Sequence, residues 1–177
     1  YIDRTDFEVL QPAIDYYESH GSATDKLRTF YYQGRIYYNR GEAEEAMECL
    51  IKSIDLGSES NDLKTKARNY TVQGTLYFLY YNWDKIIESG LAAADCYKAL
   101  EDWDNYVVIL CRISEGYSMK GDKEQASEYL SKCQDLLDKI NSNSKAYYYS
   151  GYLLNGVNNV SEEEILEIIN DYLKICP

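Results

Sequence analysis

Few side chains in this sequence have the types and spacing that catalysis requires. The chain has one histidine, His20, so a two-histidine metal motif is excluded and a catalytic triad would depend on that single ring. No phosphate-binding motif of the GxxxxGK[ST] or GxGxxG type occurs. Acidic residues cluster at 42–45 and 162–164, but each cluster opens an expected helix, where the helix dipole favours carboxylates. We therefore expect no catalytic residue, no metal site, no cofactor and no enzymatic activity.

The cysteines do not suggest a disulfide framework or a zinc site. They are odd in number, and no two of them form a CxxC pair. We expect them to be small, half-buried helix residues. The five are Cys49, Cys96, Cys111, Cys133 and Cys176.

Charge and hydropathy disfavour two classes of partner. The formal net charge is −12, whereas a nucleic-acid binder needs a basic stripe that displaces counterions. The longest purely apolar run has six residues, 106–111, so we expect no insertion into a membrane. The compartment stays open between the cytoplasm and a bacterial cell envelope.

The composition predicts an all-α protein. Only ten glycines and two prolines occur in 177 residues, and such scarce helix breakers favour helices over strands and turns. Tyrosine is abundant, with 20 residues, and must contribute to the core.

The sequence repeats every forty residues without an insertion. The column Tyr37, Tyr77 and Tyr117 is invariant, and five further columns keep the same register. These are Phe30/Tyr70/Leu110, Gly34/Gly74/Ser114, Gly41/Tyr81/Gly121, Ala46/Ile86/Ala126 and Leu50/Gly90/Leu130.

Each repeat reads as two helices joined by a short turn. Ser22 and Asp25 resemble a capping box, Gly41 is expected to take a positive φ at the turn, and Gly57 is expected to end the second helix in a left-handed cap. We expect a leading helix at 7–20 and then helix pairs within about 22–57, 62–100, 103–139 and 144–175, as one domain. The paired helices are expected at 22–39 and 42–56, 62–80 and 83–100, 103–119 and 122–139, and 144–155 and 161–175, the last opened by a capping box at Ser161 and Glu164.

Small residues inside these helices indicate close helix packing. Gly34, Gly74 and Ser114 would weaken their helices unless a neighbouring helix approaches there, and Ala46 and Ala126 are expected to meet them from the second helices. The pattern Phe30-x3-Gly34-x2-Tyr37-x3-Gly41-x4-Ala46-x3-Leu50 resembles the tetratricopeptide repeat (TPR) family. The period of forty is similar to that of long-repeat members from bacterial regulatory and envelope-signalling proteins.

This resemblance implies an α-solenoid of stacked helix pairs, wound into a right-handed superhelix. It also implies that first helices line a concave groove that binds a partner. The second unit departs from the family pattern at Tyr81, Ile86 and Gly90, the third has Ser114 in place of glycine, and the repeat-end proline is absent throughout.

Charge and tyrosine both divide between the two rows of helices. The expected first helices carry +2, +2, −1 and +1, a total of +4, whereas the second carry −4, −1, −2 and −4, a total of −11. Thirteen of the 20 tyrosines lie on first helices and three on second helices. An extended or helical peptide with acidic character therefore suits the groove.

Helical geometry selects the residues that would face this partner. Positions offset from the packing set in the first unit are Arg28, Tyr31, Arg35 and Tyr38. The counterparts are Arg68, Thr71, Thr75 and Phe78 in the second unit and Val108, Cys111, Glu115 and Ser118 in the third. If Gly151 takes the place of Gly34, those in the fourth are Lys145, Tyr148, Tyr152 and Asn155. We predict a groove lined by Arg28, Tyr31, Arg35, Tyr38, Arg68, Phe78, Tyr148 and Tyr152.

The favoured function is thus a non-catalytic scaffold for a protein or peptide partner. Family members that grip a C-terminal carboxylate use a Lys and an Asn one turn apart, and this chain has Tyr31 and Arg35 there instead. Two alternatives stay open. One is a sensor domain of a larger bacterial signalling or transcription regulator, and the other is a helical enzyme or small-molecule-binding protein that uses the same groove. Assembly with a second copy of the chain also stays open.

Overall fold

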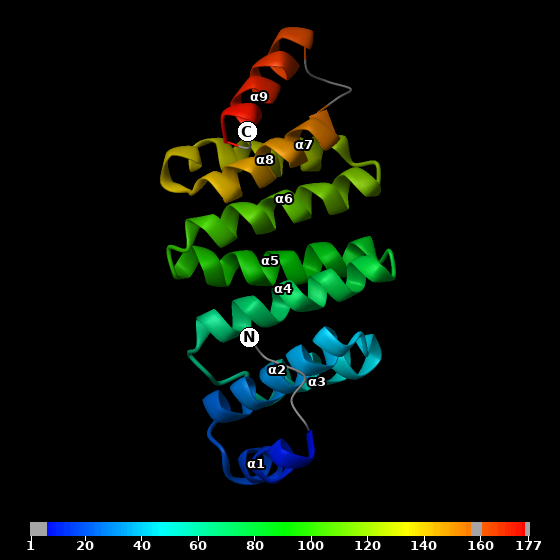
Figure 1. The fold of residues 1–177 in the computed structure, drawn as a ribbon, viewed down its shortest axis with the longest axis vertical. Helices are drawn as coiled ribbons and strands as arrows, with labels where there is room; N and C mark the ends of the chain where they lie inside the picture. The colour runs from blue at the N-terminus through cyan, green and yellow to red at the C-terminus, as the bar shows by residue number, and fades with distance from the viewer. Residues whose placement is uncertain (1–6, 157–160, 176–177) are drawn as a thin grey trace.

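The chain folds into consecutive helices stacked along one axis, with α1 at one end and α9 at the other (Figure 1). This structure, a computed structural model, describes residues 7–156 and 161–175. The described residues form helices and connecting turns and contain no strand. The α-helices are α1 (Phe7–His20), α2 (Ala23–Arg40), α3 (Ala43–Leu56), α4 (Leu63–Leu79), α5 (Trp83–Ala99), α6 (Trp103–Met119), α7 (Lys123–Gln134), α8 (Ser142–Gly156) and α9 (Glu162–Ile175).

The helices pack in consecutive pairs, α2 with α3, α4 with α5, α6 with α7 and α8 with α9, which confirms the all-α repeat architecture. One expected helix is shorter than the repeat predicted. Rather than continuing to residue 139, α7 ends at Gln134, and Leu137–Lys139 form a 3₁₀ turn. The tighter turn brings Leu136, Leu137 and Ile140 against the core, which explains why the α-helix is not continued.

Four of the turns share one backbone hydrogen bond. The N–H of the residue that precedes the next helix donates to the carbonyl of a tyrosine five residues earlier. The residue before each of these donors has a positive φ. The donor–acceptor pairs are Glu42 with Tyr37 (3.0 Å), Asn82 with Tyr77 (3.1 Å), Asp102 with Tyr97 (3.0 Å) and Asp122 with Tyr117 (2.9 Å), and the positive-φ residues are Gly41, Tyr81, Glu101 and Gly121.

Of the two glycines predicted to take a positive φ, one does and the other does not. Gly41 has φ +81°, as predicted for the turn, and Tyr81 takes the same left-handed region at φ +53° although it is not glycine. Gly57 has φ −96°, so the predicted left-handed cap is wrong there. The absence of a side chain at Gly57 instead permits close packing against α2, because a Cβ there would lie 2.5 Å from the Cβ of Leu27.

Helix-capping side chains recur every twenty residues, a regularity within the repeat of forty. Asp62, Asn82, Asp102 and Asp122 each accept a hydrogen bond from the backbone N–H three residues further on. Ser22 and Asp25 form the capping box expected at the start of α2. The helices α4 to α7 therefore each begin directly after a capping Asp or Asn side chain.

The small residues of the first helices do lie where their partners cross. A Cβ at Gly34 would lie 2.9 Å from Cγ of Leu50 and 3.1 Å from the carbonyl oxygen of Ala46, both on α3. At the equivalent crossing forty residues on, the Ser114 hydroxyl donates to the carbonyl of Ala126 at 2.7 Å. The Ala46 carbonyl is thus approached by the bare backbone of Gly34, whereas the equivalent carbonyl of Ala126 accepts a hydrogen bond from a hydroxyl.

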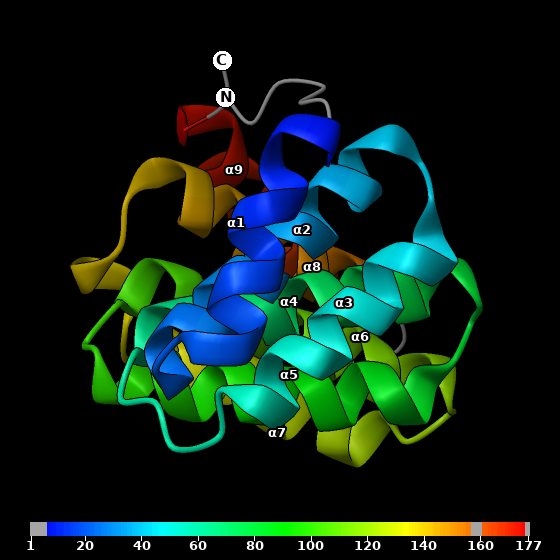
Figure 2. The same ribbon diagram turned by 90° about the horizontal axis from the view of Figure 1, so that it is seen from below.

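Two neighbouring pairs of first helices contact each other directly. Among the described residues, the strongest contacts that skip one helix join α2 with α4 and α6 with α8. Figure 2 views the stack along its length, with α1 nearest the viewer. Buried apolar residues follow the stack in two clusters, one shared by α2, α3 and α4 and the other running from α4 to α8. None of the described helices is long and apolar enough to cross a membrane.

Replacing Gly34 by Leu should lower the free energy of unfolding by about 1–3 kcal/mol, because a branched side chain must fit against Leu50 and the Ala46 carbonyl. Gly34→Ser should lose less, since its hydroxyl can reproduce the bond that Ser114 makes. Thermal unfolding of both variants checks this, at roughly 2–4 °C of Tm per kcal/mol. Equal melting of the Leu variant and the parent would contradict the packing assignment.

Candidate functional site

The eight residues predicted to line a groove lie on three first helices, α2, α4 and α8. The structure brings the α2 residues together. Nη1 of Arg35 donates to the Tyr31 hydroxyl at 3.4 Å, and the guanidinium carbon lies 5.8 Å from the centre of the Tyr38 ring. Side chains of α2 thus form one cluster of stacked and hydrogen-bonded groups.

Tyr31 is a core residue rather than a surface residue. Only 4% of it is exposed, and its ring packs with Val72 and Leu76 of α4 and with Leu50 of α3. Tyr31 thus lies in the seam between α2 and α4 and not on the predicted surface. Its ring fills this seam, and only its hydroxyl faces Arg35.

Tyr148 is likewise buried, with 3% exposed. The register predicted for α8 is therefore wrong. In the predicted register Gly151 was equivalent to Gly34, which packs against the following helix. In the structure a Cβ at Gly151 would lie 3.6 Å from Cys111 of α6 and 3.8 Å from Leu130 of α7, so this glycine faces the preceding pair. Tyr148 consequently points into the core, where burial raises its pKa, and half-buried Tyr152 packs beside it.

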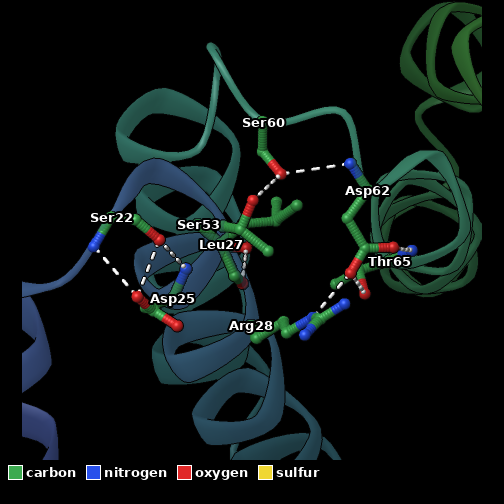
Figure 3. A network of polar contacts seen from close by, with 9 residues as sticks. Ser22, Asp25, Leu27, Arg28, Ser53, Ser60, Asp62 and Thr65 are labelled. Carbon is green, nitrogen blue, oxygen red and sulfur yellow. Dashed lines mark hydrogen bonds and ion pairs between the residues drawn. The ribbon is translucent and has the colours of Figure 1, made fainter.

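Arg28 stabilises the junction between two repeats. Its Nε lies 2.6 Å from Oδ2 of Asp62, the residue that caps α4 (Figure 3). Asp62 also accepts from the backbone N–H and the hydroxyl of Thr65, and its own N–H donates to Ser60. Arg28 is exposed, but its charge already has a partner within the chain.

The hydrogen bonds around Asp62 favour its charged form. Partial burial acts to raise the pKa of this carboxyl. The hydrogen bond from the Thr65 backbone, the guanidinium of Arg28 and the Thr65 hydroxyl outweigh that effect and hold the pKa below its usual value. Asp62 is therefore ionised whenever the protein is near neutral pH, and it holds α2 and α4 together.

Four predicted residues keep surface that a partner could contact. Arg68 is exposed on α4 and has no ion-pair partner among the described residues. Phe78 is 37% exposed, with its ring edge-on to Trp83 at 5.7 Å. Arg35 and Tyr38 are half-buried, and Nε of Arg35 has no hydrogen-bond partner in the described part of the chain.

A cavity of about 340 Å³ lies between α6 and α8. From α6 it is lined by three of the third unit's predicted counterparts, Cys111, Glu115 and Ser118, together with Met119. From α8 it is lined by Tyr147, Ser150 and Gly151. Close by, the guanidinium carbon of Arg112 lies 5.9 Å from the centre of the Tyr147 ring. Burial raises the pKa of Tyr147, and Arg112 partly opposes that rise.

His20 and Cys49 carry side chains of the types most often used in catalysis. His20 stacks on the ring of Tyr16 at 5.1 Å, at the end of α1. Burial raises the pKa of the Cys49 thiol to about 11, which disfavours the nucleophilic thiolate. Within residues 7–156 and 161–175, no three His, Cys, Asp or Glu side chains lie together as a metal ion would require.

Several residues of the Arg28–Asp62 junction and of the α6–α8 cavity are not predicted from the sequence. Asp62 was not identified as the partner of Arg28, although its spacing from Asn82 and Asp102 marks it as a helix cap. Tyr147 and Ser150 were missed because the repeat was extended to α8 in the wrong register. The capping box predicted at Ser161 and Glu164 depends on the Glu164 side chain, which lies outside those described.

Comparisons with known proteins identify the fold. No protein-family model matches the sequence, and no curated protein matches it. Solved structures do match. A kinesin light chain-like protein from Podospora anserina with nearly identical TPR-like repeats superposes with a TM-score of 0.69 at 14% identity, covering 95% of this chain and 84% of that one. The structure of a point variant of that protein gives a TM-score of 0.70 at the same identity and coverage.

The chain therefore has a TPR-like helical repeat fold, as the sequence pattern indicated.

Asp62→Asn should keep the helix cap but lose the ion pair, lowering the free energy of unfolding at pH 7 by roughly 0.5–1 kcal/mol. Because the folded-state pKa of Asp62 is lowered, its contribution is present above the unfolded pKa of about 4 and is lost as pH falls through the folded value. Urea unfolding at pH 7 and in acid should therefore show the difference from the parent shrinking in acid. Asp102→Asn, a cap with no ion pair among the described residues, is the matched control. A difference independent of pH would contradict this role.

Proposed function

We propose that this chain is a non-catalytic scaffold that binds a protein partner through a peptide segment laid across its first helices. In this proposal the first helices α2, α4, α6 and α8 line the concave side of the stack, and the contacts of α2 with α4 and of α6 with α8 support that arrangement. The segment is extended or helical and acidic where it crosses α2 and α4. It contacts Arg35, Tyr38, Arg68 and Phe78.

The observation that carries this proposal is the state of Arg35. Its side chain is half-buried, its Nε lacks a hydrogen-bond partner among the described residues, and its guanidinium lies over the Tyr38 ring. A buried guanidinium nitrogen without a partner is unfavourable, and a carboxylate of the bound segment would supply one. Tyr38 and Phe78 add apolar contact that does not depend on salt.

Charge favours an acidic segment over other partners of this surface. The expected first helices within 22–39 and 62–80 each carry +2, whereas the chain as a whole carries −12. An acidic peptide is therefore repelled by most of the molecule and attracted to α2 and α4. The same net charge disfavours nucleic acid as the ligand.

Selection of binding peptides from a random library on the purified chain tests the proposal. The variant Arg35→Ala with Arg68→Ala should bind a selected acidic peptide about tenfold more weakly, equivalent to about 1.4 kcal/mol, and its affinity should depend less on salt. Arg28 is left intact because it holds the α2–α4 junction. The readout is fluorescence anisotropy at low and high salt.

Lys98→Ala with Lys123→Ala is the matched control, since it removes two exposed cations that lie on second helices. The proposal fails if the control weakens binding as much as the arginine variant does. It also fails if the selected peptides bind with undiminished affinity once both arginines are removed.

A further inference from the structure

The seam between neighbouring first helices is filled in one repeat and hollow in another. Position by position, forty residues apart, Tyr31, Arg35 and Tyr38 of α2 correspond to Cys111, Glu115 and Ser118 of α6. In α2, Tyr31 belongs to the core that α2 shares with α4, and half-buried Tyr38 packs against that core. In α6 the replacements are smaller, and the cavity of about 340 Å³ lies at these positions. The hollow thus arises from side-chain volume that the first repeat has and the third repeat lacks.

On the opposite side of the cavity, α8 leaves this volume open. Gly151 on α8 presents no side chain toward Cys111, from which a Cβ would be 3.6 Å away. The cavity wall is largely apolar, formed by Met119, the Tyr147 ring and Cys111, with hydroxyls from Ser118 and Ser150. Its volume lies in the range of about 300–1,000 Å³ that is usual for ligand sites.

The charge at the central position is reversed between the two repeats. Where α2 has Arg35, α6 has Glu115, which lines the cavity and makes no ion pair with any described residue. The nearest cation along the helix, Arg112, lies over the Tyr147 ring instead. A carboxylate in a mostly apolar wall attracts a cation that brings its own apolar stem.

We propose that the cavity between α6 and α8 binds an arginine side chain of the partner segment, which rests on the proposed function for the existence of that segment. The arginine stem lies along Met119 and Cys111, and its guanidinium donates to the Glu115 carboxylate. The chain itself contains a related arrangement, because the Arg35 guanidinium lies over the Tyr38 ring and beside the Tyr31 hydroxyl in the equivalent seam. The bound segment is therefore acidic over α2 and α4 and carries an arginine over α6.

The cavity can be tested without the natural partner. N-acetyl-arginine amide is titrated into the purified chain while backbone amide resonances are followed by NMR. We expect saturable shifts, in the millimolar range, at Ser118, Ser150 and Gly151. N-acetyl-citrulline amide has nearly the same shape without the charge and should bind at least about tenfold more weakly, as is expected for loss of a charge-assisted hydrogen bond.

Glu115→Gln should weaken arginine amide binding by about the same factor while leaving the other resonances in place. Glu124→Gln is the matched control, because Glu124 is exposed on α7 and does not line the cavity. Equal binding of the citrulline and arginine amides, undiminished binding to the Glu115 variant, or tighter binding of N-acetyl-lysine amide would each overturn the assignment.

The peptide selection separates this inference from the proposed function. Selected peptides that bind the first helices but contain no arginine would overturn the inference and leave the function standing. Failure to select any peptide, with the arginine amide still entering the cavity, would overturn the proposed function and the partner segment, and would leave only the arginine-binding cavity.

Discussion

The repeated backbone turn, in which an N–H donates to the carbonyl of a tyrosine five residues earlier, is the constraint on which the rest of this structure depends. It reverses the chain through one residue of positive φ and leads directly into the next capping residue. Because caps follow one another every twenty residues from Asp62 to Asp122, successive helices have matched lengths. Residues forty apart therefore occupy equivalent places in successive pairs. Turn geometry thus determines which side chains occupy equivalent positions in successive repeats.

Much of this could be predicted from residues alone. The invariant tyrosines and the small residues at Gly34 and Ser114 carry the repeat, and the crossings they predicted are present. The individual surface residues were harder to predict, because a helical stripe gives direction only to within about one residue. Tyr31 was therefore predicted on the surface, whereas it lies in the α2–α4 seam. The register of α8 was lost because its only glycine in mid-helix, Gly151, packs against the preceding pair.

Equivalent positions with different side chains give the seams of the stack different shapes and charges. The seam beside α2 is closed by Tyr31 and carries the partly unsatisfied Arg35, whereas the seam beside α6 is open and carries Glu115. Arg28, on the same face, is committed to Asp62 and to the stability of the junction. Residues that hold neighbouring repeats together and residues free to meet a partner thus lie side by side on one row of helices. Charge alone does not distinguish them, and their contacts do.

The most direct measurement for this account is hydrogen–deuterium exchange of the chain with and without a selected peptide. Binding across the first helices should slow exchange in α2, α4 and α6, and in the part of α8 beside the cavity, while leaving α3, α5 and α7 unchanged. Protection confined to the acidic second helices, or spread evenly over both rows, would contradict the assignment of the binding surface.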